Sequence, residues 1–149
     1  MRALAVLLLF VAPAALAAPV PKELKQNDLA RIAGTWALTG SCSAAGQNGP
    51  PDGSSWSFTA DGKATIHRGN NQPSADGIKY VLDQTTSPKS FDWICPWGEW
   101  YGVYELKDDT FTIYLKSHAK NDAEKIRPAQ LANGPGIEMY SFKRSAAAK

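Results

Sequence analysis

The sequence predicts an all-β protein, in which about eight short antiparallel strands close into an up-and-down barrel after one short N-terminal helix. Apolar and polar residues alternate with a period of two in most segments of the chain. Turn signals rich in glycine, proline, aspartate or asparagine separate these segments, mostly at hairpin length. No connection contains the dozen periodic residues that a crossover helix needs, which disfavours a parallel βαβ architecture. Eight strands suit a closed barrel.

The first 18 residues have the layout of a secretory signal peptide. Arg2 precedes an apolar run, and small residues lead to Ala17 and Ala18. The apolar run is interrupted at Pro13 and is short for a membrane span. We therefore expect a leader over 1–18, a tether over 19–26, a barrel domain over 27–144 and a flexible tail over 145–149. The leader predicts a secreted or periplasmic protein without a membrane span after its removal.

Length and charge restrict the class further. The chain has 149 residues, so the part that follows the leader has the usual size of one domain. The whole chain carries 16 basic and 14 acidic residues, with a formal net charge of +2 and no long block of either sign. This balance argues against a nucleic acid as partner.

The helix is expected over 27–33, where Asp28 can cap it, Leu29 and Ile32 share one face, and Gly34 ends it. The Asp61-Gly62 pair lies between two alternating runs and is a strong hairpin signal. Segments 43–54 and 116–132 lack a strand pattern; the first is expected to be a surface loop, the second a loop or one short helix. The predicted strands cover 35–39, 56–58, 64–67, 78–82, 90–94, 101–106, 110–115 and 137–142.

Cys42 and Cys95 are the only cysteines of the chain. In an exported protein two cysteines can form one bond, so we expect a disulfide between them. The alternative is two separately buried thiols.

Six short motifs lie along the chain after the leader. They are Gly34-Thr35-Trp36, Tyr80-Val81-Leu82-Asp83, Pro88 before Phe91-Asp92-Trp93, Gly102-Val103-Tyr104-Glu105-Leu106, Asp109-Thr110-Phe111-Thr112-Ile113 and Arg127-Pro128. Together they resemble a planctomycete-type family of exported lipocalin-like (calycin) domains, over most of the chain after the leader. The resemblance implies a fold and no particular chemistry. This sequence departs from the family pattern at 95–100, which is richer in aromatic residues and cysteine.

The Gly34-x-Trp36 motif after a short helix also resembles the opening motif of lipocalins. There the tryptophan closes one end of the barrel under a basic residue of the last strand. The resemblance gives this role to Trp36, with Lys143 or Arg144 packed over its ring as a cation–π pair.

An aromatic cluster is the most unusual local feature. Tryptophan and tyrosine offer a large contact area with a polar edge, which suits sugars or apolar ligands. The alternative is a structural role, with Trp93 and Tyr104 in the core and Trp97 and Trp100 packed over the barrel mouth. The candidate ligand-binding residues are Trp93, Trp97, Trp100, Tyr101 and Tyr104.

No set of residues in the sequence indicates a particular reaction. His67 and His118 lie in different segments without zinc-ligand spacing, and no Gly-x-Ser-x-Gly motif is present. Asp108-Asp109 lacks the ligand spacing of a calcium loop. Four carboxylates near strand ends, those of Asp83, Asp92, Glu99 and Glu105, would form an acid–base pair only if the fold brought two together. We therefore expect no catalytic residues, no metal and no cofactor.

Two functions follow from these patterns. The first is a non-enzymatic binding module that holds a small apolar or amphipathic molecule at an open end rimmed by 43–54 and 97–101. The second is a structural or protein-interaction domain of the cell envelope, with a filled barrel and exposed tryptophans as anchors. A filled interior would count against the first.

Overall fold

The structure is a computed structural model of the chain that describes residues 27–42, 53–69, 73–118 and 126–145; the side chains of Ser74, Ser117 and His118 are not described. The predicted leader, the tether, most of the tail and most of the 43–54 loop lie outside these residues. No helix within the described ranges is long and apolar enough to cross a membrane.

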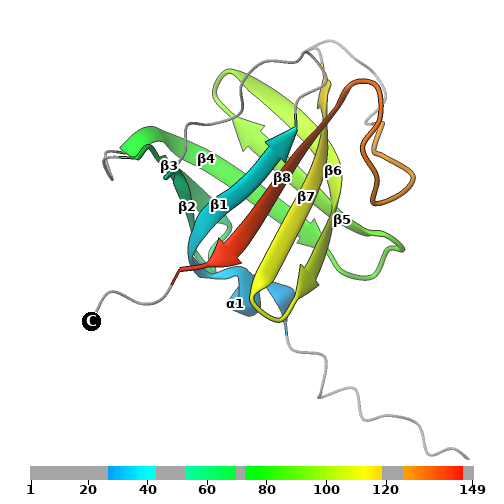
Figure 1. Cartoon of the computed structure of the whole chain (residues 1–149). Helices are drawn as coiled ribbons and strands as arrows, with labels where there is room; N and C mark the ends of the chain where they lie inside the picture. The colour runs from blue at the N-terminus through cyan, green and yellow to red at the C-terminus, as the bar shows by residue number, and fades with distance from the viewer. Residues whose placement is uncertain (1–26, 43–52, 70–72, 119–125, 146–149) are drawn as a thin grey trace, which may run out of the picture.

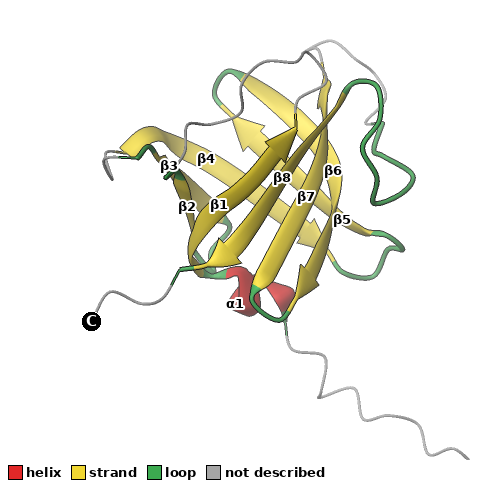
Figure 2. Cartoon of the chain, in the orientation of Figure 1, coloured by secondary structure: helices red, strands yellow, loops and turns green. Residues whose placement is uncertain are grey.

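Eight strands form one closed barrel in which each strand pairs with its neighbours in chain order and β8 pairs with β1 (Figures 1 and 2). All eight pairings are antiparallel. This confirms the predicted fold class, including the short helix α1 (Asp28–Ile32). The strands are β1 (Gly34–Cys42), β2 (Ser55–Phe58), β3 (Lys63–His67), β4 (Pro73–Asp83), β5 (Lys89–Cys95), β6 (Gly98–Lys107), β7 (Thr110–His118) and β8 (Ile137–Arg144).

Two turns follow directly from local chemistry. Gly62 has φ +81, a conformation that side chains disfavour, and a Cβ there would lie 2.9 Å from the Tyr80 carbonyl. This explains the Asp-Gly signal between β2 and β3. Asp108 has φ 43 in the turn between β6 and β7, a position that aspartate tolerates better than most residues.

Several strands are longer than the sequence pattern predicted. β1 and β4 contain irregularities in their pairing, which break the period of two. β6 begins at Gly98 rather than 101, because Cys95 pairs with Gly98 and leaves only Pro96 and Trp97 in the turn. The predicted rim 97–101 is therefore mostly strand, and no helix is present over 126–132.

The register places an aromatic core inside the barrel. Trp36, Phe91 and Phe111 are fully buried and lie in the middle and at the closed end. Phe111 contacts five aromatic neighbours with ring centroids 5.6–6.1 Å apart, which are Trp36, Phe58, Phe91, Tyr104 and Phe142. This part of the barrel is filled by side chains.

The predicted disulfide is wrong for this structure, in which both cysteines are free thiols. Cys42 is exposed at the end of β1, whereas Cys95 is buried on β5. In this closed barrel of eight strands, three strands separate β1 from β5 in either direction, so the two strands lie on opposite walls. A disulfide needs Cα atoms within about 7 Å.

Candidate functional site

The two ends of the barrel differ in how they are covered. Helix α1 lies across one end, where β1 starts and β8 ends (Figure 1). At the opposite end, β5 stops at Cys95 and β6 starts at Gly98. Side chains that face the interior there are only partly buried: Ile66, Ala75, Trp100, Glu138 and Tyr140. We call this end the open end.

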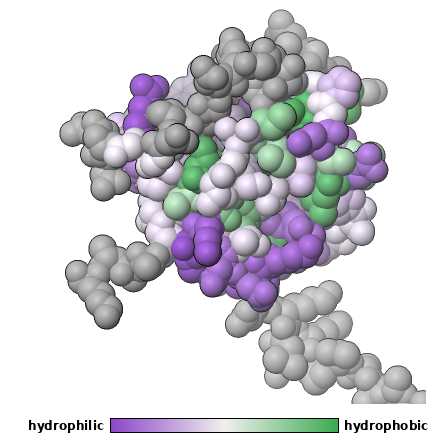
Figure 3. Space-filling model, viewed as in Figure 1, coloured by the Kyte–Doolittle hydropathy of each residue, from purple (hydrophilic) through white to green (hydrophobic). Residues whose placement is uncertain are grey.

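On one outer face of the barrel, hydropathy also differs between the closed end and the strands above it. Figure 3 shows hydrophilic residues gathered at the closed end, around the helix and the neighbouring turn. The strand surface above them mixes weakly polar and apolar residues.

Stacked aromatic rings form the floor of the interior below the open end. The rings of Trp56 and Trp93 are stacked with centroids 4.8 Å apart, and the Tyr140 ring lies 5.1 Å from Trp56. Trp100 is the register partner of Trp93, so their side chains are on the same face. These four residues place three indoles and a phenol on the interior side of the barrel at this end.

Two indole N–H groups in this region have no acceptor. Trp56 Nε1 and Trp100 Nε1 are buried and make no hydrogen bond to any of the described residues. The Trp93 side chain differs, because it bonds the Cys95 thiol. A buried donor without an acceptor costs about 1–3 kcal/mol. Most such groups in folded proteins have a partner, so these two indoles are unusual, and an acceptor from another molecule would reach them only if neighbouring side chains moved.

A polar pair on β8 lies beside the aromatic floor. The hydroxyl of Tyr140 donates to Glu138 Oε2 at 2.8 Å. Burial, followed by the bond to Glu138, raises the pKa of Tyr140 above its usual value, which favours the protonated hydroxyl that donates to Glu138. Tyr140 pairs with the buried Ile113 and Glu138 with the buried Leu115, which places both side chains toward the interior.

The predicted aromatic residues are divided among four places. Trp93 and Trp100 lie inside at the open end, as described above. Trp97 is 60% exposed in the turn between β5 and β6. Tyr101 faces outward with the Arg127 guanidinium 5.4 Å from its ring. Tyr104 is buried near the closed end. The structure thus brings together two of the five residues and adds Trp56 and Tyr140, which the sequence analysis missed.

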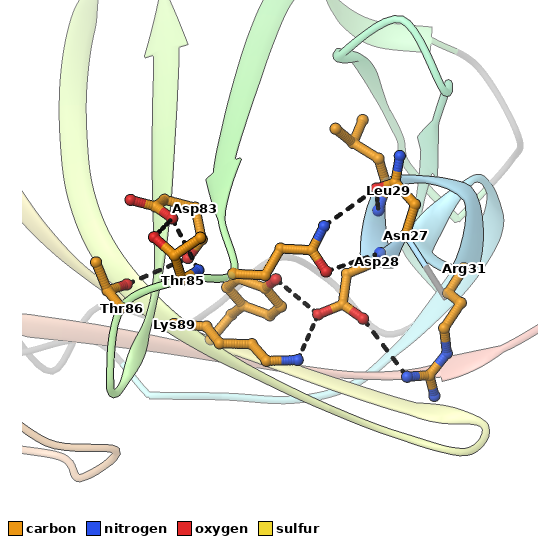
Figure 4. Close-up of polar contacts among 10 residues, drawn as sticks. Asn27, Asp28, Leu29, Arg31, Asp83, Thr85, Thr86 and Lys89 are labelled. Carbon is orange, nitrogen blue, oxygen red and sulfur yellow. Dashed lines mark hydrogen bonds and ion pairs between the residues drawn. The ribbon is translucent and has the colours of Figure 1, made fainter. Parts of the chain in front are cut away.

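Asp28 anchors the helix at the closed end rather than capping it (Figure 4). The cap is Asn27, whose side chain accepts from the Leu29 amide. The Asp28 carboxylate is buried, with Lys89 Nζ at 2.6 Å and the Tyr104 hydroxyl at 2.8 Å. Burial and this bond raise the pKa of Tyr104. The group fixes α1 beneath the barrel and does not reach the open end.

The basic residue over Trp36 is Arg144, not Lys143. Its guanidinium lies 4.3 Å from the Trp36 ring centroid, and it donates to the carbonyl oxygens of Ala33 and Arg31. Gly34 has φ +124, and a Cβ there would lie 3.2 Å from Arg144 Nη1. The Gly-x-Trp motif is therefore part of the closure of this end.

The candidate acid–base residues do not meet. Asp83 bonds Thr85, Asp92 bonds Arg127 at 2.5 Å, Glu99 accepts from Tyr101 and Glu105 pairs with Lys107. Their register positions all face outward on β4, β5 and β6.

His67, the one histidine whose side chain is described, does not complete a catalytic set either. His67 Nε2 lies 3.2 Å from Ser57 Oγ on the outer face, and the described contacts give this pair no carboxylate. No group of three or more His, Cys, Asp or Glu side chains that could hold a metal ion is found in the described ranges.

Comparison with known proteins adds one structural neighbour. No protein-family model and no curated protein matches the chain. Among solved structures, the chain is similar to the crystal structure of wild-type fluorescent protein UnaG, with 15% identity and a TM-score of 0.41. The similarity covers 78% of this chain and 99% of that chain.

Proposed function

We propose that the protein is a non-enzymatic, extracytoplasmic binding module that holds a small apolar or amphipathic molecule at the open end of its barrel. The observation that carries the proposal is the pair of buried indole N–H donors, Trp56 Nε1 and Trp100 Nε1, for which the described residues offer no acceptor. A ligand oxygen or nitrogen at this place would complete both groups, while its apolar part lies on the aromatic floor.

The packing of the barrel limits the size of such a ligand. The core from Trp36 to Phe91 and Phe111 is fully buried and filled. Trp56 and Trp93 are themselves only 3% and 5% exposed, so a ligand would contact the partly buried side chains at the open end, close to the solvent. We expect a molecule of one or two rings or a short chain rather than one that fills the whole barrel.

The leader-like segment over 1–18 supports a location outside the cytoplasm. A compartment outside the cytoplasm suits a binding module that meets small molecules of the surroundings. Detection of a chain that starts near Pro19 in the exported fraction is the expected result of N-terminal sequencing.

Native mass spectrometry of the protein purified gently from its own exported fraction tests the binding. The expected result is a reproducible added mass of a small molecule on the monomer. Trp100→Phe keeps an aromatic ring but removes the N–H donor, so retention of this molecule should fall about 2- to 10-fold. Trp97→Phe is the matched control, because Trp97 is 60% exposed in a turn, and it should leave retention unchanged.

A neutral fluorescent probe, N-phenyl-1-naphthylamine, gives a second measurement that does not depend on a co-purified ligand. Its fluorescence should rise on binding to the wild type and to Trp97→Phe. A bare protein in the mass spectrum together with no fluorescence change would overturn the proposal.

A second candidate is a protein-interaction domain, favoured by the filled lower barrel and by the exposure of Trp97. Exposed tryptophans are frequent anchors in interfaces. Here Trp97→Ala would abolish capture of an envelope partner, whereas Trp100→Phe would not. The two variants therefore separate the two functions.

A further inference from the structure

The charge inside the open end is carried by one residue. Among the described strand positions that face the interior in this half of the barrel, Glu138 alone has a charged side chain. The cationic residues of the interior are at the other end, where Arg144 bonds the carbonyl oxygens of Arg31 and Ala33 and Lys89 bonds Asp28. The aromatic floor lies between the two groups.

Glu138 is only partly satisfied by the protein. A carboxylate has about four lone-pair sites for hydrogen-bond donors. The Tyr140 hydroxyl fills one of them, at 2.8 Å. The side chain is half-buried beside Tyr140, whose ring contacts Trp56. A carboxylate in such surroundings gains from a second donor, and most from a cationic one, because interactions between charges strengthen where water is partly excluded.

Aromatic faces beside a carboxylate are a recognised environment for organic cations. The negative faces of indole and phenol rings attract an ammonium group, and the attraction increases when water is removed. An anionic ligand would instead meet the Glu138 charge with no cation of this half to offset it. A neutral ligand would bond the indoles but leave Glu138 unpaired.

On the basis of the proposed function, we propose that the ligand of this barrel is a small amphipathic amine, whose protonated nitrogen pairs with Glu138 and whose apolar body lies against the partly buried rings of Trp100 and Tyr140. Glu138 thus selects the charge of the ligand, and the aromatic rings select its shape.

Three probes with the same ring system and different charge test this proposal. They are 1-naphthylmethylammonium, 1-naphthylmethanol and 1-naphthylacetate, titrated into the full-length mature protein by isothermal titration calorimetry at pH 7. We expect the cation to bind most tightly, the alcohol less tightly and the anion least. Hydrogen bonds to charged groups contribute about 1.5–3 kcal/mol, so the cation should be favoured over the alcohol about 10- to 100-fold.

Glu138→Gln should remove the preference for the cation over the alcohol, because the amide still accepts from Tyr140 and carries no charge. Glu105→Gln is the matched control, because that residue lies on the outer face and pairs with Lys107. Glu105→Gln should bind the three probes in the same order of affinity as the wild type. Circular dichroism would verify that both variants are folded.

The possible results separate the two proposals. If no probe binds, the ligand-binding function itself is overturned and this inference with it. If the alcohol or the anion binds the wild type as tightly as the cation, the inference fails while the binding function stands. The inference also fails if the preference for the cation survives in Glu138→Gln.

Discussion

The guanidinium of Arg144 lies 4.3 Å from the centre of the Trp36 ring and so joins the last strand to the first at the closed end of the barrel. The same group donates to the carbonyl oxygens of Arg31 and Ala33, at the end of α1. One side chain therefore connects the helix, β1 and β8. Trp36 itself donates to the Ile32 carbonyl at 2.6 Å.

Arg144→Ala should lower the free energy of unfolding by about 2–4 kcal/mol, because it removes a cation–π contact and the bonds to two carbonyl oxygens. Arg144→Lys should recover part of this loss, since lysine keeps the charge but lacks the planar group. Lys143→Ala, at an exposed neighbouring position, should change stability by less than about 0.5 kcal/mol. Urea denaturation of the three variants checks the order. Equal losses for Arg144→Ala and Lys143→Ala would contradict it.

The buried carboxylate of Asp28 should matter for the docking of α1. Asp28→Ala removes the partner of the Tyr104 hydroxyl and of Lys89 Nζ, so we expect a loss of about 2–4 kcal/mol. Lys89 is partly exposed and water can replace its partner, which keeps the loss below that of a fully buried pair. Hydrogen exchange of the α1 amides should accelerate in the variant.

Asp61→Asn is the control for Asp28→Ala. It removes the ion pair with Lys63, whose two side chains are 57% and 68% exposed, and keeps a residue suited to the turn. Its effect on the free energy of unfolding should be much smaller than that of Asp28→Ala, because both partners are exposed to water. A large effect there, with none at Asp28, would show that the closed end is not anchored as described.

Most of the fold could be predicted because its signals are local. Alternation identified the strands, Asp61-Gly62 identified a hairpin, and Gly34-x-Trp36 identified the closed end. The bounds of β1 and β4 could not be predicted in the same way, because irregular pairing interrupts the period of two in both strands.

The candidate site was harder to predict because it depends on which face each residue takes. Trp100 and Tyr101 are adjacent in one strand and must face opposite sides, so a cluster read along the sequence could not form one surface. The alternation in β8 did contain the missing signal. If Phe142 and Tyr140 face the core, Glu138 faces it too. The separation of Cys42 and Cys95 depends on the order of strands around the barrel, which no local pattern reveals.

Stability at high pH should depend on Tyr80. Burial, followed by the charge of Asp61, raises the pKa of Tyr80 from 10.0 to about 12. The unfolded chain loses this proton near pH 10, while the folded protein keeps it until about pH 12. The stabilising effect of the neutral hydroxyl is therefore complete below pH 10 and is lost as the pH rises through this window, by about 1.4 kcal/mol per unit of pH.

Tyr80→Phe tests this dependence. At pH 8 the variant should be less stable by about 1 kcal/mol, because it lacks the hydrogen bond from the hydroxyl to the Thr59 carbonyl. Between pH 10 and 12 its stability should fall less steeply than that of the wild type, so that the difference shrinks or reverses. Urea denaturation at pH 8 and pH 11 measures both points. If the wild type and Tyr80→Phe lost stability equally between pH 8 and pH 11, groups other than Tyr80 would cause the loss.

The two thiols should differ sharply in reactivity. Cys42 is exposed, whereas burial raises the pKa of Cys95 to about 11, and the thiolate is the reactive form. Without reductant, a thiol reagent such as Ellman's reagent at pH 8 should modify one residue in the folded protein and two after denaturation in urea. Cys42→Ser should abolish the fast reaction and leave the slow one. If the denatured wild type showed no thiol without reductant, the two residues would be oxidised, and the opposite positions of β1 and β5 would then require that the bond join different molecules.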